Sequence, residues 1–407
     1  MNVLYISYDG MTDLLGQSQV IPYLSGLSQK GYKIHVISCE KKKTFVVERA
    51  GVDEIFLKNR ISWSPLRFST FPPFFSKLFD VYNIGCTATR LHRKTPFDVV
   101  HCRSYVAAFV GLYFKKHLGV RFLFDMRGFW VDERFEGKIW KRTNLLFRMV
   151  YRYFKLREAE FFSRADAIVS LTETGLQIIG KTFGKEVEKI ASVIPCCVDT
   201  ELFSSKKIIQ EAKVSLREKL GIEPAHFVVS YLGSTGTWYM TAEMMAFFGR
   251  LIKTFPDARF LFITGENPEL IFLEAQKASL DVASIIVVKA KRHEVPLYLS
   301  LSDISLYFIK PVFSKKASSP TKLAEIMSMG IPIITNPGIG DTDQILKESG
   351  AGILIDNFSE EAYDRAIKKI PAILKKDPES IRQCAIDNFN LHWGIEKYHE
   401  IYQGLSK

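Results

Sequence analysis

The chain has 407 residues, which is too long for one core and favours two domains of about 200 residues each. Apolar residues make up 47% of the sequence, enough to fill both cores. The net charge of +11 favours partners that carry phosphate groups or anionic lipid. We expect no nucleic-acid partner, because the sequence has no zinc-finger spacing, aromatic RNP pattern or compact helix-turn-helix.

The cysteines and the start of the chain bear on the compartment. The six cysteines form no C-x-x-C pair and have no histidines at metal spacing, so we expect no structural zinc and a reducing environment. Residues 2–7 read as a strand, which leaves no room for a signal peptide, and no uncharged apolar run reaches the ~18 residues of a spanning helix. We therefore expect a cytoplasmic protein, and leave open a peripheral position on the inner face of the cell membrane.

The first half of the chain alternates short apolar strands with helical patterns. Val3–Ser7 is followed by a glycine-containing loop, Tyr8–Ser18, and by a helix that ends near Gly31. Further strands are expected at Lys33–Ser38, Glu54–Leu57, Asp98–Cys102, Arg121–Met126, Ala167–Leu171 and Ala191–Ile194. The alternation predicts a parallel sheet covered on both faces, with ligands at the carboxyl ends of its strands. The loop lacks G-x-G-x-x-G, so a dinucleotide cofactor is not indicated.

Two segments of this half combine aromatic and basic residues. The first, Arg60–Asn83, contains Trp63, Phe68, Phe71, Phe74, Phe75 and Phe79 with Arg60, Arg67 and Lys77. The second, Arg134–Phe162, contains Trp140, Phe147, Tyr151, Tyr153 and Phe154 with Lys138, Lys141, Arg142, Arg148, Arg152, Lys155 and Arg157. Such segments lie on anionic membranes, or else their aromatics are core residues with a solvated basic rim. Both interpretations stay open.

The segment Phe124–Arg134 follows a strand and is therefore expected at the ligand-binding edge of the sheet. Arg127 could hold a phosphate or a carboxylated sugar, while Asp132 or Glu133 could bind an acceptor hydroxyl. A structural cluster of ion pairs is the alternative. His101, at the end of the preceding strand, is expected to be a hydrogen-bonded core histidine.

The second half repeats the same design. Strands are expected at His226–Leu232, Arg259–Thr264, Ser284–Val288, Asp303–Phe308, Ile331–Thr335 and Gly352–Ile355. The first of them ends in the glycine loop Gly233–Thr237, and Arg292 follows another at a place suited to a nucleotide base. Ile381–Tyr402 reads as one long helix.

The stretch from Ser318 to Asn336 predicts a helix entered through Ser319 and Pro320, ended by Gly330 and followed by a buried strand. With Pro320 at the first helical position, the free N–H groups of the first turn form an anion site on the positive end of the helix dipole. Lys322 adds a full positive charge there, and Glu325 could accept hydrogen bonds from vicinal hydroxyls. A diphosphate beside a ribose would fit this pattern, although an ordinary capped helix would also produce it.

Residues 322–332, KLAEIMSMGIP, resemble the E-x-M-x-x-G-x-P segment of the retaining nucleotide-sugar glycosyltransferases of family 4. Val193–Phe203 similarly resembles the I-P-x-x-V-D-x-x-x-F segment in which that family crosses between domains. The resemblance implies the α/β GT-B fold, in which two Rossmann-like doubly wound domains face each other across a cleft. Residues 1–203 would bind the acceptor, residues 213–387 would bind the nucleotide-sugar, and a helix at 388–407 would return to the first domain.

The resemblance also implies roles for individual residues. The donor would be bound by Gly16, Gln17, Gly233, Ser234, Thr235, Arg292, Ser319, Thr321, Lys322 and Glu325. The catalytic residues would be Arg127, Asp132, Glu133 and Lys322. The chain departs from the family in three places: Ala317 stands where a second Glu is usual, Arg127 stands near a usual His, and the Gly233–Thr237 loop lacks the two cations that commonly bind the diphosphate.

The resemblance favours transfer of a sugar from a nucleoside diphosphate donor to a hydroxyl, with retention and without a cofactor or metal. Asp341-Thr-Asp343 is predicted on a helix start, so it does not indicate a metal-binding D-x-D. Members that build bacterial surface polysaccharide use a glycan or polyprenyl-linked acceptor, which would bring the first domain to an anionic membrane surface. A sugar-nucleotide epimerase of similar fold and a non-catalytic membrane-associated scaffold remain alternatives.

Overall fold

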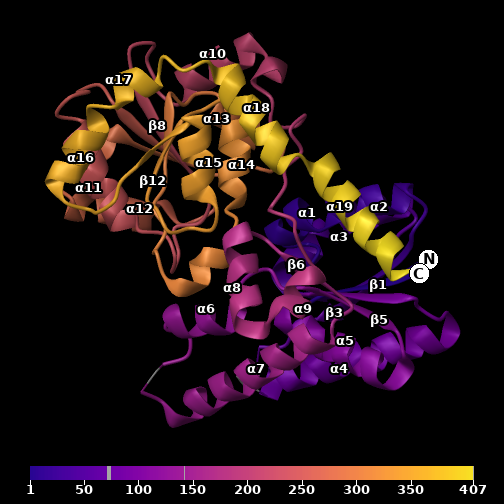
Figure 1. The fold of residues 1–407 in the computed structure, drawn as a ribbon. Helices are drawn as coiled ribbons and strands as arrows, with labels where there is room; N and C mark the ends of the chain where they lie inside the picture. Colours follow the sequence, from indigo (N-terminus) through magenta and orange to yellow (C-terminus); the bar gives the residue numbers. More distant parts are fainter. Residues whose placement is uncertain (71–74, 142, 407) are drawn as a thin grey trace. The chain divides into compact units, whose positions relative to one another are not determined.

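The computed structural model describes residues 1–70, 75–141 and 143–406. The chain forms two compact units: the N-terminal unit comprises Met1–Cys197 and Leu391–Lys407, and the C-terminal unit comprises Val198–Asn390 (Figure 1). Phe71, Phe74 and Arg142, which belong to the aromatic and basic segments of the sequence, lie outside the described residues.

The N-terminal unit is built on a parallel sheet with the strand order β3-β2-β1-β4-β5-β6-β7. Its strands are β1 (Asn2–Ser7), β2 (Lys33–Glu40), β3 (Ser62–Arg67), β4 (Val99–Arg103), β5 (Arg121–Asp125), β6 (Ala167–Ser170) and β7 (Ala191–Val193). The central strands are buried on both faces, as expected for a sheet with helices on either side. The strand order reverses between β1 and β4, and ligands of such sheets bind at this point, beyond the carboxyl ends of the strands.

The helices of this unit are α1 (Leu14–Gln19), α2 (Ile21–Gln29), α3 (Lys42–Lys58), α4 (Phe75–Lys94), α5 (Ser104–Leu118), α6 (Trp130–Glu136), α7 (Leu145–Arg164), α8 (Glu173–Phe183), α9 (Lys185–Lys189) and α19 (Leu391–Leu405). The C-terminal helix α19 belongs to this unit and packs on α2. A Cβ at Gly26 of α2 would lie 2.3 Å from Ile395 Cδ1, so this close approach requires glycine. The rings of Tyr23 and Tyr398 meet edge to face beside it.

Three expectations from the sequence are wrong in detail. Glu54–Leu57 is not a strand but the end of α3, whose two buried residues, Val52 and Phe56, have helical spacing. The strand missed by the sequence is β3, an edge strand that tolerates Pro65 because a proline there need not donate to a neighbour. The helix after the glycine loop is interrupted at Val20, and the long C-terminal helix is interrupted at Asn390, where the backbone is extended.

The C-terminal unit contains a second parallel sheet, with the order β10-β9-β8-β11-β12-β13. Its strands are β8 (Val228–Leu232), β9 (Arg259–Ile263), β10 (Ile285–Val288), β11 (Ile304–Leu306), β12 (Ile333–Thr335) and β13 (Gly352–Leu354). Its α-helices are α10 (Gln210–Lys219), α11 (Thr241–Leu251), α12 (Pro268–Lys277), α13 (Val295–Leu299), α14 (Thr321–Ser328), α15 (Thr342–Ser349), α16 (Glu360–Ile367), α17 (Ile370–Ile373) and α18 (Pro378–Phe389). All six strands expected from the sequence are present. The strand order reverses between β8 and β11, which marks the ligand-binding point of this sheet.

Candidate functional site

The helix predicted to bind phosphate is α14, with one change at its start. Pro320 is the residue before the helix, not its first residue, because its ψ of 116° is extended. Thr321 therefore begins the helix, while Ser319 is half-buried in the turn before it. At the other end, Gly330 has φ +76°, and a Cβ there would lie 2.8 Å from the Pro378 carbonyl oxygen. A glycine is thus required where α14 ends against α18.

Lys322 of α14 lies in a cage of three tyrosines at the point where the strand order reverses. Its amine is 3.8 Å from the ring centre of Tyr239, 4.2 Å from that of Tyr231 and 5.6 Å from that of Tyr307. It donates one hydrogen bond, of 3.2 Å, to the Tyr231 hydroxyl. Tyr231 lies in β8 and Tyr307 directly follows β11. The cage was not predicted, since none of its rings is near Lys322 in sequence.

The Lys322 ammonium is almost fully buried, with 6% of the residue exposed. Among the residues that the structure describes, no carboxylate lies within ion-pair distance of it. Burial therefore lowers the pKa of Lys322 well below its usual value, and Glu325 opposes this only in part. A ligand with negative charge would stabilise a buried cation in this environment, because it would offset the cost of removing the charge from water.

Gly233 is brought to the same place, as the sequence predicted. It has φ +116°, and a Cβ there would lie 3.0 Å from Lys322 Nζ, so the glycine leaves the amine approachable. The following residues form a loop in which Ser234 is exposed and Thr235 half-buried. The Tyr231 hydroxyl donates to the Ser234 carbonyl, which fixes this loop beside the Lys322 cage.

Glu325 and Arg292 are brought together, although the sequence assigned them to different parts of a nucleotide. The Arg292 guanidinium donates to the Glu325 carboxylate and lies over the Phe203 ring, 4.6 Å from its centre. Burial raises the pKa of Glu325, while Arg292 and Lys322 act in the opposite direction. Ala317, in place of the family's second Glu, is fully buried.

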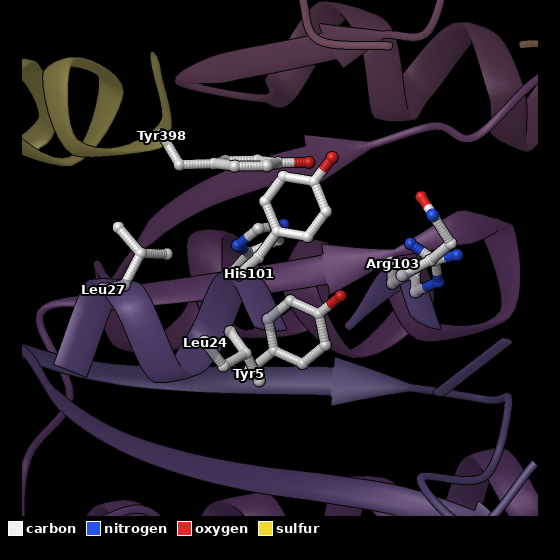
Figure 2. Close-up of a pocket in the computed structure, with 8 residues that line it drawn as sticks. Tyr5, Leu24, Leu27, His101, Arg103 and Tyr398 are labelled. Carbon is white, nitrogen blue, oxygen red and sulfur yellow. The ribbon is translucent and has the colours of Figure 1, made fainter. Parts of the chain in front are cut away.

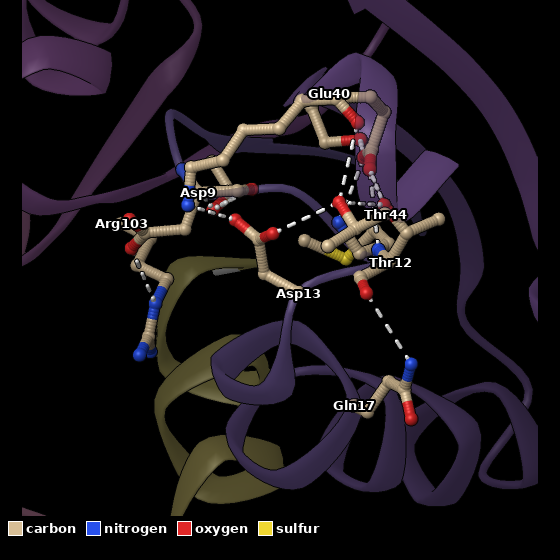
Figure 3. A network of polar contacts seen from close by, with 11 residues as sticks. Asp9, Thr12, Asp13, Gln17, Glu40, Thr44 and Arg103 are labelled. Carbon is tan, nitrogen blue, oxygen red and sulfur yellow. Dashed lines mark hydrogen bonds and ion pairs between the residues drawn. The ribbon is translucent and has the colours of Figure 1, made fainter. Parts of the chain in front are cut away.

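In the N-terminal unit, Glu40 holds the glycine loop in place (Figure 3). This buried carboxylate accepts hydrogen bonds from the backbone N–H groups of Met11 (2.7 Å) and Thr12 (3.2 Å) and from the Thr12 hydroxyl. Gly16 packs α1 against the loop, since a Cβ there would lie 2.2 Å from the Gly10 carbonyl oxygen. Gln17 donates to the Thr12 carbonyl at 3.3 Å. The place of Glu40 at the end of β2, next to β1, is the signal by which it could have been found.

The carboxyl ends of β4 and β5 carry a buried group of charged residues, of which Figure 2 shows His101 and Arg103 of β4. His101 is a core histidine, as predicted: its Nδ1 is 2.7 Å from the Tyr402 hydroxyl, and burial lowers its pKa. Asp125 is fully buried and accepts from the Tyr398 hydroxyl at 3.1 Å. Burial alone would raise the pKa of Asp125, but Arg127, His101 and Arg103 lower it.

Asp132 is engaged elsewhere. Its carboxylate accepts from the Tyr151 hydroxyl at 2.7 Å and from Lys155 Nζ at 3.0 Å, which ties α6 to α7. This arrangement fits the structural alternative that the sequence left open. Glu133 is half-buried on the same helix.

Comparison with known proteins identifies the family. Residues 18–202 match the family model described as Glycosyltransferase Family 4, and residues 213–385 match the model described as Glycosyl transferases group 1. The chain belongs to glycosyltransferase family 4. Its fold is the two-domain α/β GT-B fold of that family.

Solved structures with the same fold cover the whole of this family 4 glycosyltransferase. The sucrose-phosphate synthase of Thermosynechococcus elongatus has a TM-score of 0.75 at 15% identity, covering 100% of this chain and 99% of its own. A glycosyltransferase of Rickettsia africae has a TM-score of 0.71 at 17% identity, and the match covers 100% of this chain and 98% of that one. Anabaena HepE in complex with UDP-glucose has a TM-score of 0.71 at 13% identity, and the match covers 100% of this chain and 99% of that one.

A curated relative matches over part of its length. The alpha-monoglucosyldiacylglycerol synthase of Acholeplasma laidlawii is 23% identical over 192 residues, which are 46% of this chain. The match spans 44% of that relative, less than half its length.

The burial of Lys322 predicts how stability depends on pH. Its pKa is lowered in the folded state, so between that lowered value and the ordinary 10.5 the unfolded state binds more protons and stability rises with pH. Lys322→Met removes this contribution, so the stability of the variant relative to the unaltered protein should fall as pH rises from 7 to about 10. Urea unfolding at several pH values measures the difference, and a difference independent of pH would contradict it.

Proposed function

We propose that this glycosyltransferase moves a sugar from a nucleoside diphosphate-sugar to a hydroxyl acceptor with retention, and that the C-terminal unit binds the donor. The observation that carries the proposal is the caged Lys322 ammonium at the start of α14, which has a buried positive charge and no carboxylate paired with it among the described residues. HepE, which has the same fold, was solved with UDP and with UDP-glucose, and this supports a nucleotide-sugar donor.

The reaction needs stabilisation of the departing diphosphate, which gains negative charge as the bond to the sugar breaks. Lys322 faces this group together with the free N–H groups at the start of α14, and Ser234 and Thr235 add neutral donors. These groups are fixed before the reaction, so little reorganisation accompanies the charge transfer. This positive charge comes from the chain itself, and we propose that the transfer needs no metal ion.

Glu325 is proposed to accept hydrogen bonds from the ribose hydroxyls. Arg292 then has two functions: it favours the ionised form of the carboxylate against the effect of burial, and its position over Phe203 holds it beside the nucleoside. An epimerase or a scaffold is not favoured, because both halves of the chain match glycosyltransferase models.

Nucleotide binding tests the donor site. Lys322→Ala should lower UDP or GDP affinity by about 1.5–3 kcal/mol, because a charge-assisted contact to the diphosphate is lost, and the loss should be larger at low salt. Glu325→Ala should lower affinity with little salt dependence. Calorimetry measures both, with the exposed Lys347→Ala in the same unit as the control. Unchanged affinity in both site variants would refute the assignment.

A lipid-linked acceptor is proposed from the surface of the N-terminal unit. Helix α7 exposes Leu145 (69%), Met149 (62%) and Leu156 (73%) on the side that also carries the exposed Arg148 and Arg152. Helix α4 exposes Leu78, Phe79 and Tyr82, and both helices pack against α5. Exposed apolar side chains interleaved with arginines suit an anionic membrane surface.

Not every aromatic of the two segments is exposed in this way. Trp63 donates to the Ser38 hydroxyl at 2.8 Å and packs against Phe56, so it belongs to the fold of the sheet. Across the described residues, no helix is long and apolar enough to cross a membrane. The name of the Acholeplasma relative describes a glucosyl-diacylglycerol synthase, which supports a lipid acceptor here. We propose peripheral attachment to the inner face of the cell membrane through α4 and α7.

Liposome binding tests the membrane proposal. The unaltered protein should co-sediment with liposomes that contain anionic lipid, bind neutral ones weakly, and be released by high salt, since each cation near the surface contributes about 1 kcal/mol. The variant Arg148→Glu/Arg152→Glu should lose binding and keep its nucleotide affinity. The matched control is Lys219→Glu/Lys375→Glu, two exposed cations of the C-terminal unit. If the unaltered protein does not co-sediment with anionic liposomes at low salt, the proposed attachment through α4 and α7 is wrong.

A further inference from the structure

Two arginines converge on one carboxylate at the ligand-binding edge of the N-terminal sheet. Arg103 ends β4 and pairs in register with Asp125, which ends β5. Arg103 Nη1 lies 4.0 Å from Asp125 Oδ2, and Arg127 Nη1 lies 3.8 Å from Asp125 Oδ1. Both contacts are ion pairs too long to be hydrogen bonds.

The hydrogen-bonding capacity of these guanidinium groups is largely unused. Each can donate five hydrogen bonds. Among the described residues, one hydrogen bond of Arg103 goes to Tyr5, but its buried Nε has no partner, and the carboxylates of Asp9 and Asp125 lie 3.8 and 4.0 Å away. Within the part of the chain that the structure describes, the hydrogen bond of the Arg127 guanidinium goes to Cys196 Sγ, at 3.2 Å. Buried arginines in folded proteins normally have such donors satisfied.

The buried charges are also out of balance. Arg103 and Arg127 are both at least nine-tenths buried, whereas Asp125 is the one fully buried carboxylate between them. His101 lies 3.6 Å from Asp125, and burial lowers its pKa, so it offers no compensating negative charge. The other acid in range is Asp9, which is 48% exposed and reaches Arg103 Nε only to 3.8 Å (Figure 3). One further negative group would balance the two positive charges of Arg103 and Arg127 against two negative ones.

We propose that Arg103 and Arg127 form a site for an anionic group of the acceptor, a phosphate or a carboxylate. The inference rests on the proposed function, because it takes the N-terminal unit to be the acceptor-binding one. A guanidinium binds either anion through two parallel hydrogen bonds, which a lysine cannot do. The site lies beside the reversal between β1 and β4, where ligands of this sheet are expected.

The space beside Arg103 suits an anionic oxygen. A small pocket lined by Tyr5, Gln19, His101, Arg103 and Tyr398, among others, has room for about one water-sized group beside Arg103 (Figure 2). Asp9 borders the exposed side of Arg103 and repels an incoming anion. The two buried guanidinium groups attract the same anion, so acceptors with a negative group should still bind more tightly than those without one.

Small probes test the site on the full chain. Methyl phosphate represents a lipid-linked phosphate, methyl glucuronide an acidic glycan, and methyl glucoside a neutral control. Binding is followed by ³¹P line broadening for the phosphate and by proton saturation transfer for the two sugars, at constant ionic strength with UDP present in excess. At least one anionic probe should bind more tightly than methyl glucoside, and which one does so identifies the source of the anion.

Three variants locate the binding. Arg103→Lys and Arg127→Lys keep the charge beside Asp125 but lose the paired donors, so affinity for the anionic probe should fall about tenfold. Asp9→Asn, at a half-exposed side chain, removes the negative charge 3.8 Å from Arg103 and should raise the affinity. Arg164→Lys and Asp53→Asn, both exposed, are the matched controls and should change nothing.

The inference is overturned if neither anionic probe binds more tightly than methyl glucoside. It is also overturned if the affinity for the anionic probe is unchanged both in Asp9→Asn and in every arginine variant that folds. UDP affinity is measured in parallel on the same samples. Failure of the probes with UDP binding intact rejects only the anion site, whereas loss of UDP binding in the unaltered protein rejects the proposed function.

Discussion

The C-terminal unit buries an ammonium group to which no carboxylate of the described residues is paired, and the proposed donor site is arranged around this charge. Moving a cation out of water is costly, and one tyrosine hydroxyl with three aromatic faces returns only part of that cost. Glu325 is close in sequence but is held by Arg292. The positive charge of Lys322 is therefore compensated only when an anion binds, and a site for a leaving diphosphate needs this property.

The position of Lys322 depends on contacts far from it. Arg382 of α18 donates to the carbonyls of Thr200, Phe203 and Ser328 at 2.6–2.7 Å, so it fixes the end of α14 against the segment that enters this unit. The close approach at Gly330 completes this support. In the N-terminal unit Glu40 has the equivalent part, since one buried carboxylate orders the backbone of the glycine loop. Both ligand-binding edges are thus held by single buried charged side chains.

Much of the fold could be predicted from the sequence because it depends on local patterns. Buried parallel strands give short apolar runs, and the helix-to-strand stretch around Lys322 combines a proline, a lysine and a glycine at fixed spacing. The edge strand β3 was not predicted, because it is short, half-buried and contains Pro65, so it lacks the apolar run of its neighbours.

The details of the site could not be predicted in the same way, because they are contacts between distant residues. Tyr231 is 91 residues from Lys322, and Tyr398 is 273 residues from Asp125. No spacing rule connects such pairs. Asp132 is a further example: its place after a strand suggested a site residue, and no spacing indicated the contacts of its carboxylate with Tyr151 and Lys155 of the next helix.

The central claim is that the bound diphosphate compensates and stabilises the positive charge of Lys322, and the protons taken up on binding measure this directly. Calorimetric titration with UDP in two buffers of different ionisation enthalpy, at a pH above the pKa of the nucleotide phosphate, reports the protons exchanged on binding. Burial lowers the pKa of Lys322 in the free protein and a bound diphosphate raises it again, so binding should take up protons as the pH of the titration is raised from 7 towards about 10. Lys322→Arg should bind UDP without this uptake because arginine stays charged. Enthalpies that are the same in both buffers for the unaltered protein would contradict the account.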